Sequence, residues 1–132
     1  MPRHFTLEEA TALLPRLTEI LLEIQERQRA LARLRQDLTA ATLKAAGNGH
    51  LMERELAQKR RAVEEAARRV EEMASQIREL GCELKGIDEG LVDFPTQLEG
   101  REVYLCWRLG EERIAYWHEL HTGFAGRQPL QP

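Results

Sequence analysis

The sequence predicts an α+β protein in which a long, coiled-coil-like antiparallel helical hairpin is followed by a small four-stranded antiparallel sheet. Two observations support this prediction. Between residues 15 and 80, apolar residues recur at helical spacing. After Gly81 the pattern changes to short alternating segments separated by glycine-containing turns. We expect residues 1–132 to form a single domain, with the hairpin in residues 1–81 and a β-meander and glycine-rich tail in residues 82–132.

The start of the hairpin carries clear helix signals. Thr6 and Glu9 have the spacing of a capping box, in which each residue's side chain binds the other's backbone amide. Pro15 then either kinks the helix or begins a second one, because proline lacks an amide donor and fits the first helical turn. We favour a short first helix, a bend near Leu14, and a long helix over residues 15–46 that stops at residues 47–49, Gly-Asn-Gly.

The second long helix is expected over residues 51–80. Leu56, Val63, Val70 and Ile77 lie seven residues apart, and apolar residues follow most of them three positions later. This is the heptad pattern of a coiled-coil seam, interrupted only at Lys59. Gly81 follows the last apolar residue and is expected to end the helix in the left-handed conformation.

Apolar residues such as Leu22 and Ala67 lie outside the seam that one hairpin would bury. Two such hairpins could cover these residues by forming a four-helix bundle, so we predict a homodimer through the hairpin. The alternative is that the sheet of the same chain covers this spare face.

Four strands are predicted after the hairpin, over residues 82–85, 91–94, 102–109 and 113–120. Gly86, Gly90, Pro95, Gly100 and Gly110 supply the turn signals between them. The short connections favour an antiparallel meander. Residues 123–129 are predicted to form a loop.

Composition excludes several classes of partner. The chain has 132 residues, is 42% hydrophobic and 31% charged, and carries a net charge of −3. Neither half is strongly basic, so we expect no nucleic-acid partner. No apolar run approaches the roughly 20 residues of a membrane span. The N-terminus lacks the apolar core of a signal peptide, so we expect no membrane partner, a cytoplasmic location and reduced thiols at Cys82 and Cys106.

Four residues have side chains that bind zinc or iron: Cys82, Cys106, His118 and His121. Their spacing matches no metal motif, so we predict no metal site and no cofactor. One question stays open. Cys106 and His118 share a face of the sheet only if the connection around Gly110 has an odd number of residues. Cys106 is otherwise expected to be a buried core residue rather than a nucleophile.

Two charged residues, Asp93 and Arg108, lie within otherwise apolar strands. Burying such charges is costly unless they are paired. They either face solvent or pair with each other or with His118 and Arg127. The second arrangement would create a polar cluster able to bind an anion or a polar ligand. The candidate ligand-binding residues are therefore Asp93, Arg108, His118 and Arg127, and no residue is a candidate catalyst.

The chain also resembles an uncharacterised bacterial family that is catalogued only as a domain of unknown function. The resemblance rests on an ordered series of motifs: FTLEEA and LLP near the start, then GLVDFP, REVYLCWRLGE, WHEL and GFAGRQP. It implies a small bacterial protein with no assigned activity, and it names no substrate. Asp93, Arg108, His118 and Arg127 lie within these motifs, whereas Cys82 and His121 lie at their edges.

Three functional hypotheses follow from the sequence. The leading one is a non-enzymatic cytoplasmic protein whose hairpin drives oligomerisation and whose aromatic sheet and tail meet a protein partner. The second is a small enzyme or ligand-binding protein that uses the polar cluster. The third is a zinc-binding or iron-binding protein.

Overall fold

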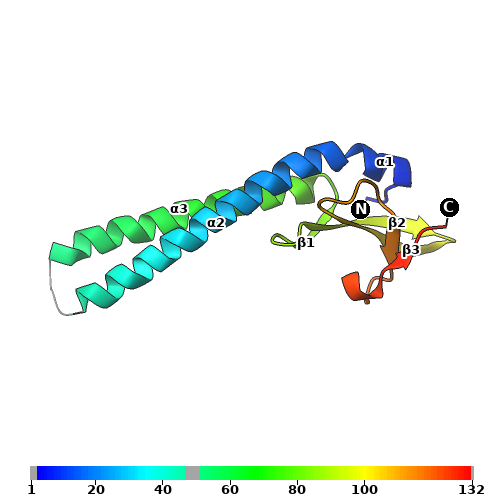
Figure 1. The fold of residues 1–132 in the computed structure, drawn as a ribbon. Helices are drawn as coiled ribbons and strands as arrows, with labels where there is room; N and C mark the ends of the chain where they lie inside the picture. The colour runs from blue at the N-terminus through cyan, green and yellow to red at the C-terminus, as the bar shows by residue number, and fades with distance from the viewer. Residues whose placement is uncertain (1–2, 47–50, 132) are drawn as a thin grey trace. The chain divides into compact units, whose positions relative to one another are not determined.

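The computed structural model describes residues 3–46 and 51–131. The chain divides into two compact units (Figure 1). Within the described residues, the first unit contains residues 3–22 and 74–131, and the second contains Glu23–Met73. In the part of the chain that the structure describes, no helix is both long enough and apolar enough to cross a membrane.

Helices α1, Leu7–Ala12, and α2, Leu14–Ala45, follow one another as predicted. The capping box is present, since the Thr6 hydroxyl accepts from the Glu9 amide at 3.1 Å and the Glu9 carboxylate accepts from the Thr6 amide at 2.9 Å. Pro15 is the second residue of α2, where its missing amide hydrogen costs nothing. The predicted break near Leu14 is therefore confirmed.

The second unit is a helical hairpin. It consists of α2 beyond Leu22 and most of α3, Leu51–Glu79, and the two helices run side by side in opposite directions (Figure 1). Lys59, which interrupts the heptad pattern, forms an ion pair with Asp37 of the other helix at 2.8 Å. The polar residue in the seam therefore has a partner across the hairpin. The predicted stop at residues 47–49 lies outside the described residues.

Gly81 follows α3 with a φ of +97° and its amide donates to the Arg78 carbonyl at 2.9 Å. A side chain at this position would approach Arg3 and Phe5 closely. Both the backbone conformation and the lack of space therefore favour glycine, as the sequence predicted.

The antiparallel sheet has five strands in the order β1-β2-β3-β4-β5. The strands are β1 Glu83–Gly86, β2 Leu91–Leu98, β3 Arg101–Arg108, β4 Tyr116–His118 and β5 Gln128–Pro129. The predicted α+β class and meander are confirmed, but the prediction of four strands was wrong by one. Part of the expected tail loop pairs with β4 as the fifth strand. A two-residue strand has too few residues to show an alternating pattern, so the sequence could not reveal it.

Strand β2 continues through Pro95, where the sequence analysis ended it. The Pro95 carbonyl points away from β3 and accepts from the Phe5 amide at 2.7 Å. The proline nitrogen points to the same side as this carbonyl. Strand β1 does not extend that far, because its pairing with β2 ends at Asp93. No strand needs a donor there, so proline is tolerated. The hairpin between β2 and β3 turns instead at Glu99 and Gly100, which both have positive φ.

The core of the first unit lies on one face of the sheet. Phe5 packs edge-on against Phe94 with ring centroids 5.4 Å apart, and the Thr96 hydroxyl donates to the Phe5 carbonyl at 2.6 Å. The side chains of Val92, Leu105 and Trp107 alternate onto this same face and are buried. In Figure 1, α1 lies on one side of the sheet and the short helix η1, Phe124–Gly126, lies on the other.

Candidate functional site

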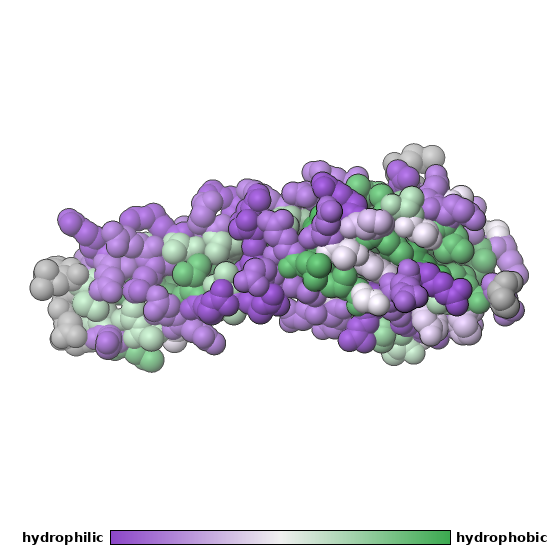
Figure 2. Space-filling model, turned by 45° about the horizontal axis from the view of Figure 1, so that its top comes forward, coloured by the Kyte–Doolittle hydropathy of each residue, from purple (hydrophilic) through white to green (hydrophobic). Residues whose placement is uncertain are grey.

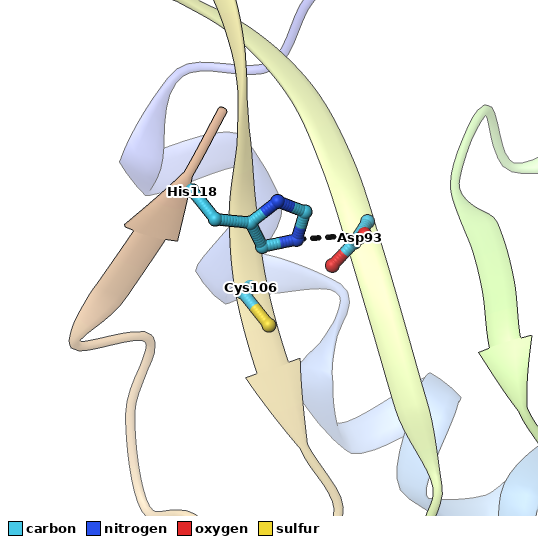
Figure 3. Close-up of side chains that lie close together, drawn as sticks. All are labelled: Asp93, Cys106 and His118. Atoms are coloured by element: carbon cyan, nitrogen blue, oxygen red, sulfur yellow. Dashed lines mark hydrogen bonds and ion pairs between the residues drawn. The ribbon is translucent and has the colours of Figure 1, made fainter. Parts of the chain in front are cut away.

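Three titratable side chains from adjacent strands meet on the sheet face opposite the core (Figure 3). Asp93 of β2 pairs directly with Cys106 of β3, and residues paired in this way share a face. Cys106 in turn pairs with Tyr116, so His118 lies two residues further along the same face. The connection between β3 and β4, residues 109–115, has an odd number of residues. The structure therefore decides the open question: Cys106 and His118 share a face.

The three side chains are almost inaccessible to solvent. Asp93, Cys106 and His118 have relative exposures of 2%, 1% and 1%. Nε2 of His118 lies 2.9 Å from Oδ2 of Asp93, and Nδ1 lies 2.7 Å from the Glu119 carbonyl oxygen. One carboxylate oxygen, the Cys106 sulfur and one imidazole nitrogen all lie within 4.8 Å of one another.

These contacts determine where the imidazole hydrogens lie. A carbonyl oxygen can only accept, so Nδ1 of His118 must carry a hydrogen and donate it to Glu119. The lone pairs of Nε2 and of the Asp93 carboxylate would then repel each other unless a proton or a metal ion lies between the two atoms. In the protein alone, a single shared proton lies there. The pair is therefore either imidazolium with carboxylate, or neutral imidazole with a protonated Asp93.

Burial controls the charge of this site. It raises the pKa of the Asp93 carboxyl above its ordinary value, although the charge and hydrogen bond of His118 act in the opposite direction. Burial also raises the pKa of the Cys106 thiol to about 12, and the negative charge of Asp93 adds to this effect. Cys106 is thus a neutral thiol in the protein alone, with its sulfur within 4.8 Å of an Asp93 carboxylate oxygen.

Cys106 is not arranged as a catalytic nucleophile. Such a thiol needs a neighbouring base that can take its proton. Both nitrogens of His118 are already engaged, by Asp93 and by the Glu119 carbonyl. With a pKa of about 12, the thiol would also be a poor source of thiolate near neutral pH. The geometry therefore supports binding at this site rather than covalent catalysis by Cys106.

A pocket of about 120 Å³ opens beside the three side chains. Its polar lining is Asp93, Cys106 and His118, together with Lys85, whose ammonium pairs with Glu83 at 2.9 Å. The rest of its lining is Leu91 of β2 together with Leu120, Gly123 and Phe124 from the segment after β4.

Arg127 holds the segment that forms this wall. Its Nη2 atom donates to the Glu111 carboxylate at 2.7 Å and to the Cys106 carbonyl at 3.2 Å. The guanidinium also lies 4.1 Å from the Tyr116 ring centroid and 4.6 Å from that of Phe124. The two aromatic contacts and the two hydrogen bonds fix the tail against β3 and β4.

Arg108 lies near Phe124 and Glu111, as Arg127 does, and is not among the residues that line the pocket. Its side chain is exposed and its guanidinium lies 5.9 Å from the Phe124 ring centroid. Its backbone amide donates to Glu111 at 2.7 Å. Glu111 thus joins Arg127 to the end of β3.

The four predicted binding residues therefore fall into two adjacent groups. Asp93 and His118 line the pocket, whereas Arg108 and Arg127 gather around Glu111 and Phe124. A ligand-binding role for each remains a prediction. The sequence analysis favoured Cys106 as a core residue and left open whether it shares a face with His118, because the number of residues between β3 and β4 could not be fixed from the sequence. Cys82 is buried elsewhere and His121 is exposed.

Comparison with protein families adds one finding. The profile of the uncharacterized conserved protein family DUF2203 matches residues 3–130, nearly the whole chain. The chain belongs to the DUF2203 family. The expected resemblance to an uncharacterised family is thereby confirmed at the level of the family. No curated protein and no solved structure matched the chain. DUF2203 membership covers both compact units and assigns no role to Asp93, Cys106 and His118.

Proposed function

We propose that this protein is a binding protein for a small ligand, which it takes into the pocket beside Asp93 and His118. The observation that carries the proposal is a buried carboxylate–imidazole pair that lines a pocket with otherwise mainly apolar walls. Binding sites for small molecules commonly combine an apolar surface with a few polar groups that fix orientation. Leu91, Leu120 and Phe124 provide the apolar surface here.

The size and charge of the pocket define the class of ligand. A volume of about 120 Å³ admits a group of only a few non-hydrogen atoms. The Lys85 ammonium, which pairs with Glu83 at 2.9 Å, could turn from that carboxylate towards a negatively charged group, whereas the apolar walls favour a short hydrocarbon portion. Propionate, with 1-propanol as its uncharged counterpart, is therefore a suitable pair of probes.

Binding can be measured by nuclear magnetic resonance on protein labelled at methyl groups and aromatic rings. We expect saturable shifts at Leu91, Leu120 and Phe124, larger with propionate than with 1-propanol. Asp93→Asn should change these ligand-induced shifts. Asp37→Asn, which makes the same substitution at an exposed position of the hairpin, should leave them unchanged. Native mass spectrometry of freshly purified protein would show whether a small molecule is retained. If neither probe shifts these signals and no molecule is retained, the proposal is wrong.

A second proposed function, self-association through the hairpin, is favoured by the incomplete burial of the seam. Leu34, Leu38, Leu56 and Val63 are only partly buried, and Leu43 is 75% exposed. In Figure 2 the hairpin surface is mainly hydrophilic, but hydrophobic residues show between the charged ones. A second copy of the chain could cover these residues in a four-helix bundle. This homodimer would have the oligomerisation role that the leading sequence hypothesis requires.

The homodimer can be tested by sedimentation equilibrium at micromolar concentration. We expect a dimer mass for the natural chain and a shift towards monomer for Leu43→Glu, which places a charge on exposed apolar surface. Gln58→Glu introduces the same charge at another exposed position and should leave the dimer intact. A natural chain that sediments as a monomer would contradict this second function.

A cytoplasmic location is also part of the proposal. Cys82 and Cys106 are both free and buried. Free thiols persist most readily in a reducing compartment, which supports the cytoplasm.

A further inference from the structure

We infer that Asp93, Cys106 and His118 together bind one divalent transition-metal ion, for which zinc is the best match. The inference rests on the proposed function, because the ion would form the innermost part of what the pocket binds. It differs from the sequence prediction, which expected no metal site. The change comes from the register of β3 and β4, which brings the thiol and the imidazole to one face.

The geometry suits a tetrahedral ion. The three candidate ligand atoms lie within 4.8 Å of one another. Bond lengths of about 2.0–2.3 Å in a tetrahedral zinc site place ligand atoms roughly 3.3–3.8 Å apart. The Asp93 and His118 atoms, now 2.9 Å apart, need to separate by roughly 0.4–0.9 Å when an ion replaces the shared hydrogen. Side-chain rotation alone can supply such a movement.

The orientation of His118 is already that of a metal ligand. Its Nδ1–H donates to the Glu119 carbonyl, so the Nε2 lone pair is directed towards Asp93 and Cys106. Histidines that bind metal characteristically use their other ring nitrogen in this way, which fixes the tautomer and the ring. A backbone carbonyl holds this orientation irrespective of pH.

Charge balance also favours the ion. Binding would displace the Cys106 thiol hydrogen and the hydrogen shared by Asp93 and His118. One dipositive ion would then lie with one carboxylate, one thiolate and one neutral imidazole, giving a buried group with no net charge. This avoids the cost of an uncompensated charge in a nearly inaccessible site.

The ligand set selects the type of ion. Calcium and magnesium prefer oxygen ligands only, whereas sulfur, nitrogen and oxygen together favour zinc and chemically similar ions. Three protein ligands leave a fourth tetrahedral position open. Because all three residues line the pocket, that position faces Leu91, Leu120 and Phe124. A water molecule or a small anion could occupy it.

Cobalt(II) provides the direct test, because it substitutes for zinc and gives absorption bands that report coordination. The full chain, purified without a histidine tag and freed of metal with a chelator, would be titrated with cobalt chloride. We expect one ion per chain, tetrahedral d–d bands and a sulfur-to-cobalt charge-transfer band. Zinc added afterwards should displace cobalt at a stoichiometry of one.

Matched variants locate the ion. Cys106→Ser should abolish the charge-transfer band. It should also weaken zinc binding by more than roughly 10- to 100-fold, which is the cost of removing a residue that only hydrogen-bonds to a metal ligand. Cys82→Ser, at the other buried cysteine, should retain the band. His118→Gln should lose binding, whereas His121→Gln, at an exposed histidine, should not. Circular dichroism of each metal-free variant would establish that it is folded, and Asp93→Asn provides a second ligand variant if Cys106→Ser does not fold.

Three outcomes would overturn the inference: failure to bind cobalt or zinc at one ion per chain, binding that survives Cys106→Ser unchanged, or a charge-transfer band lost in Cys82→Ser. The propionate titration of metal-free protein separates this result from the proposed function. If propionate binds and the metals do not, only the metal assignment fails. If neither binds, both fail.

Discussion

Nε2 of His118 lies 2.9 Å from Oδ2 of Asp93, and both side chains are buried on the sheet face opposite the hydrophobic core. The other ring nitrogen is held by the Glu119 carbonyl. The imidazole therefore cannot rotate or exchange its tautomer without leaving a buried polar atom unpaired. This contact joins β2 to β4 across the intervening β3 and defines one side of the pocket.

Removing the carboxylate should expose how much this contact stabilises the fold. Asp93→Ala leaves the His118 nitrogen buried without a partner, and we expect a loss of about 3 kcal/mol in unfolding free energy. Asp93→Asn can donate its amide hydrogen to Nε2, so it should cost only about 1 kcal/mol. Urea unfolding of metal-free protein would measure both values.

Asp37→Ala is the control for that comparison, because Asp37 makes an exposed ion pair with Lys59. Pairs of this kind contribute about 1 kcal/mol or less. A loss for Asp93→Ala no larger than that for Asp37→Ala would show that the contact between Asp93 and His118 does not stabilise the fold.

The two thiols should be unreactive in the folded, metal-free protein. Burial raises the pKa of both Cys82 and Cys106 to about 12. Relative to an ordinary thiol with a pKa near 8.5, this lowers the thiolate fraction at pH 8 by roughly a thousandfold. We expect disulfide-exchange reagents to label native protein at least about 100-fold more slowly than protein unfolded in guanidinium. Rapid labelling of Cys106 alone would indicate an activated thiol and contradict the argument against nucleophilic catalysis.

Much of the helical part was predictable because its signals are local. The capping box at Thr6 and the glycine stop at Gly81 each depend on a few neighbouring residues, and both are present. The end of β2, by contrast, could not be predicted from neighbouring residues alone. Pro95 looked like a strand terminator, and only the position of Phe5, which is distant in sequence, shows why the strand continues through it.

The candidate site was only partly predictable for a similar reason. Asp93 and His118 could be suspected because charged or titratable residues stand out in apolar strands. Whether Cys106 lies beside them depends on the length of the connection formed by residues 109–115. One residue more or fewer would place Cys106 and His118 on opposite faces, and composition does not determine this length. The contact between Glu111 and Arg127 depended on the short strand β5, which left no sequence pattern.

Arg127 should be more important for the order of the tail than for global stability. Arg127→Lys keeps the charge but loses the planar contacts with Tyr116 and Phe124. We expect hydrogen exchange at the Leu130 amide, which bonds to the Ala115 carbonyl at 2.9 Å, to accelerate by roughly tenfold, or about 1.4 kcal/mol. Arg113→Lys, at an exposed position, should leave that amide unchanged. An unchanged Leu130 exchange rate in Arg127→Lys would show that Arg127 does not hold the tail.

The Glu111–Arg127 pair should also make stability depend on pH. Burial raises the pKa of Glu111, but hydrogen bonds from Arg127 and from the Arg108 amide outweigh it, so the pKa lies below its ordinary value near 4.5. A lowered pKa in the folded state means that the contribution is fully present above the unfolded-state pKa. It is lost as pH falls through the lower folded-state pKa.

The difference in unfolding free energy between the natural chain and Glu111→Gln should therefore be constant from pH 7 to about pH 5. It should decrease below about pH 4.3, where the unfolded carboxyl is half protonated. Glu112→Gln, at the exposed neighbouring position, controls for the loss of one negative charge. A difference that stays constant down to pH 3, or that grows as the pH falls, would show that Glu111 is not held ionised by Arg127. Urea midpoints measured at half-unit intervals of pH would resolve these outcomes.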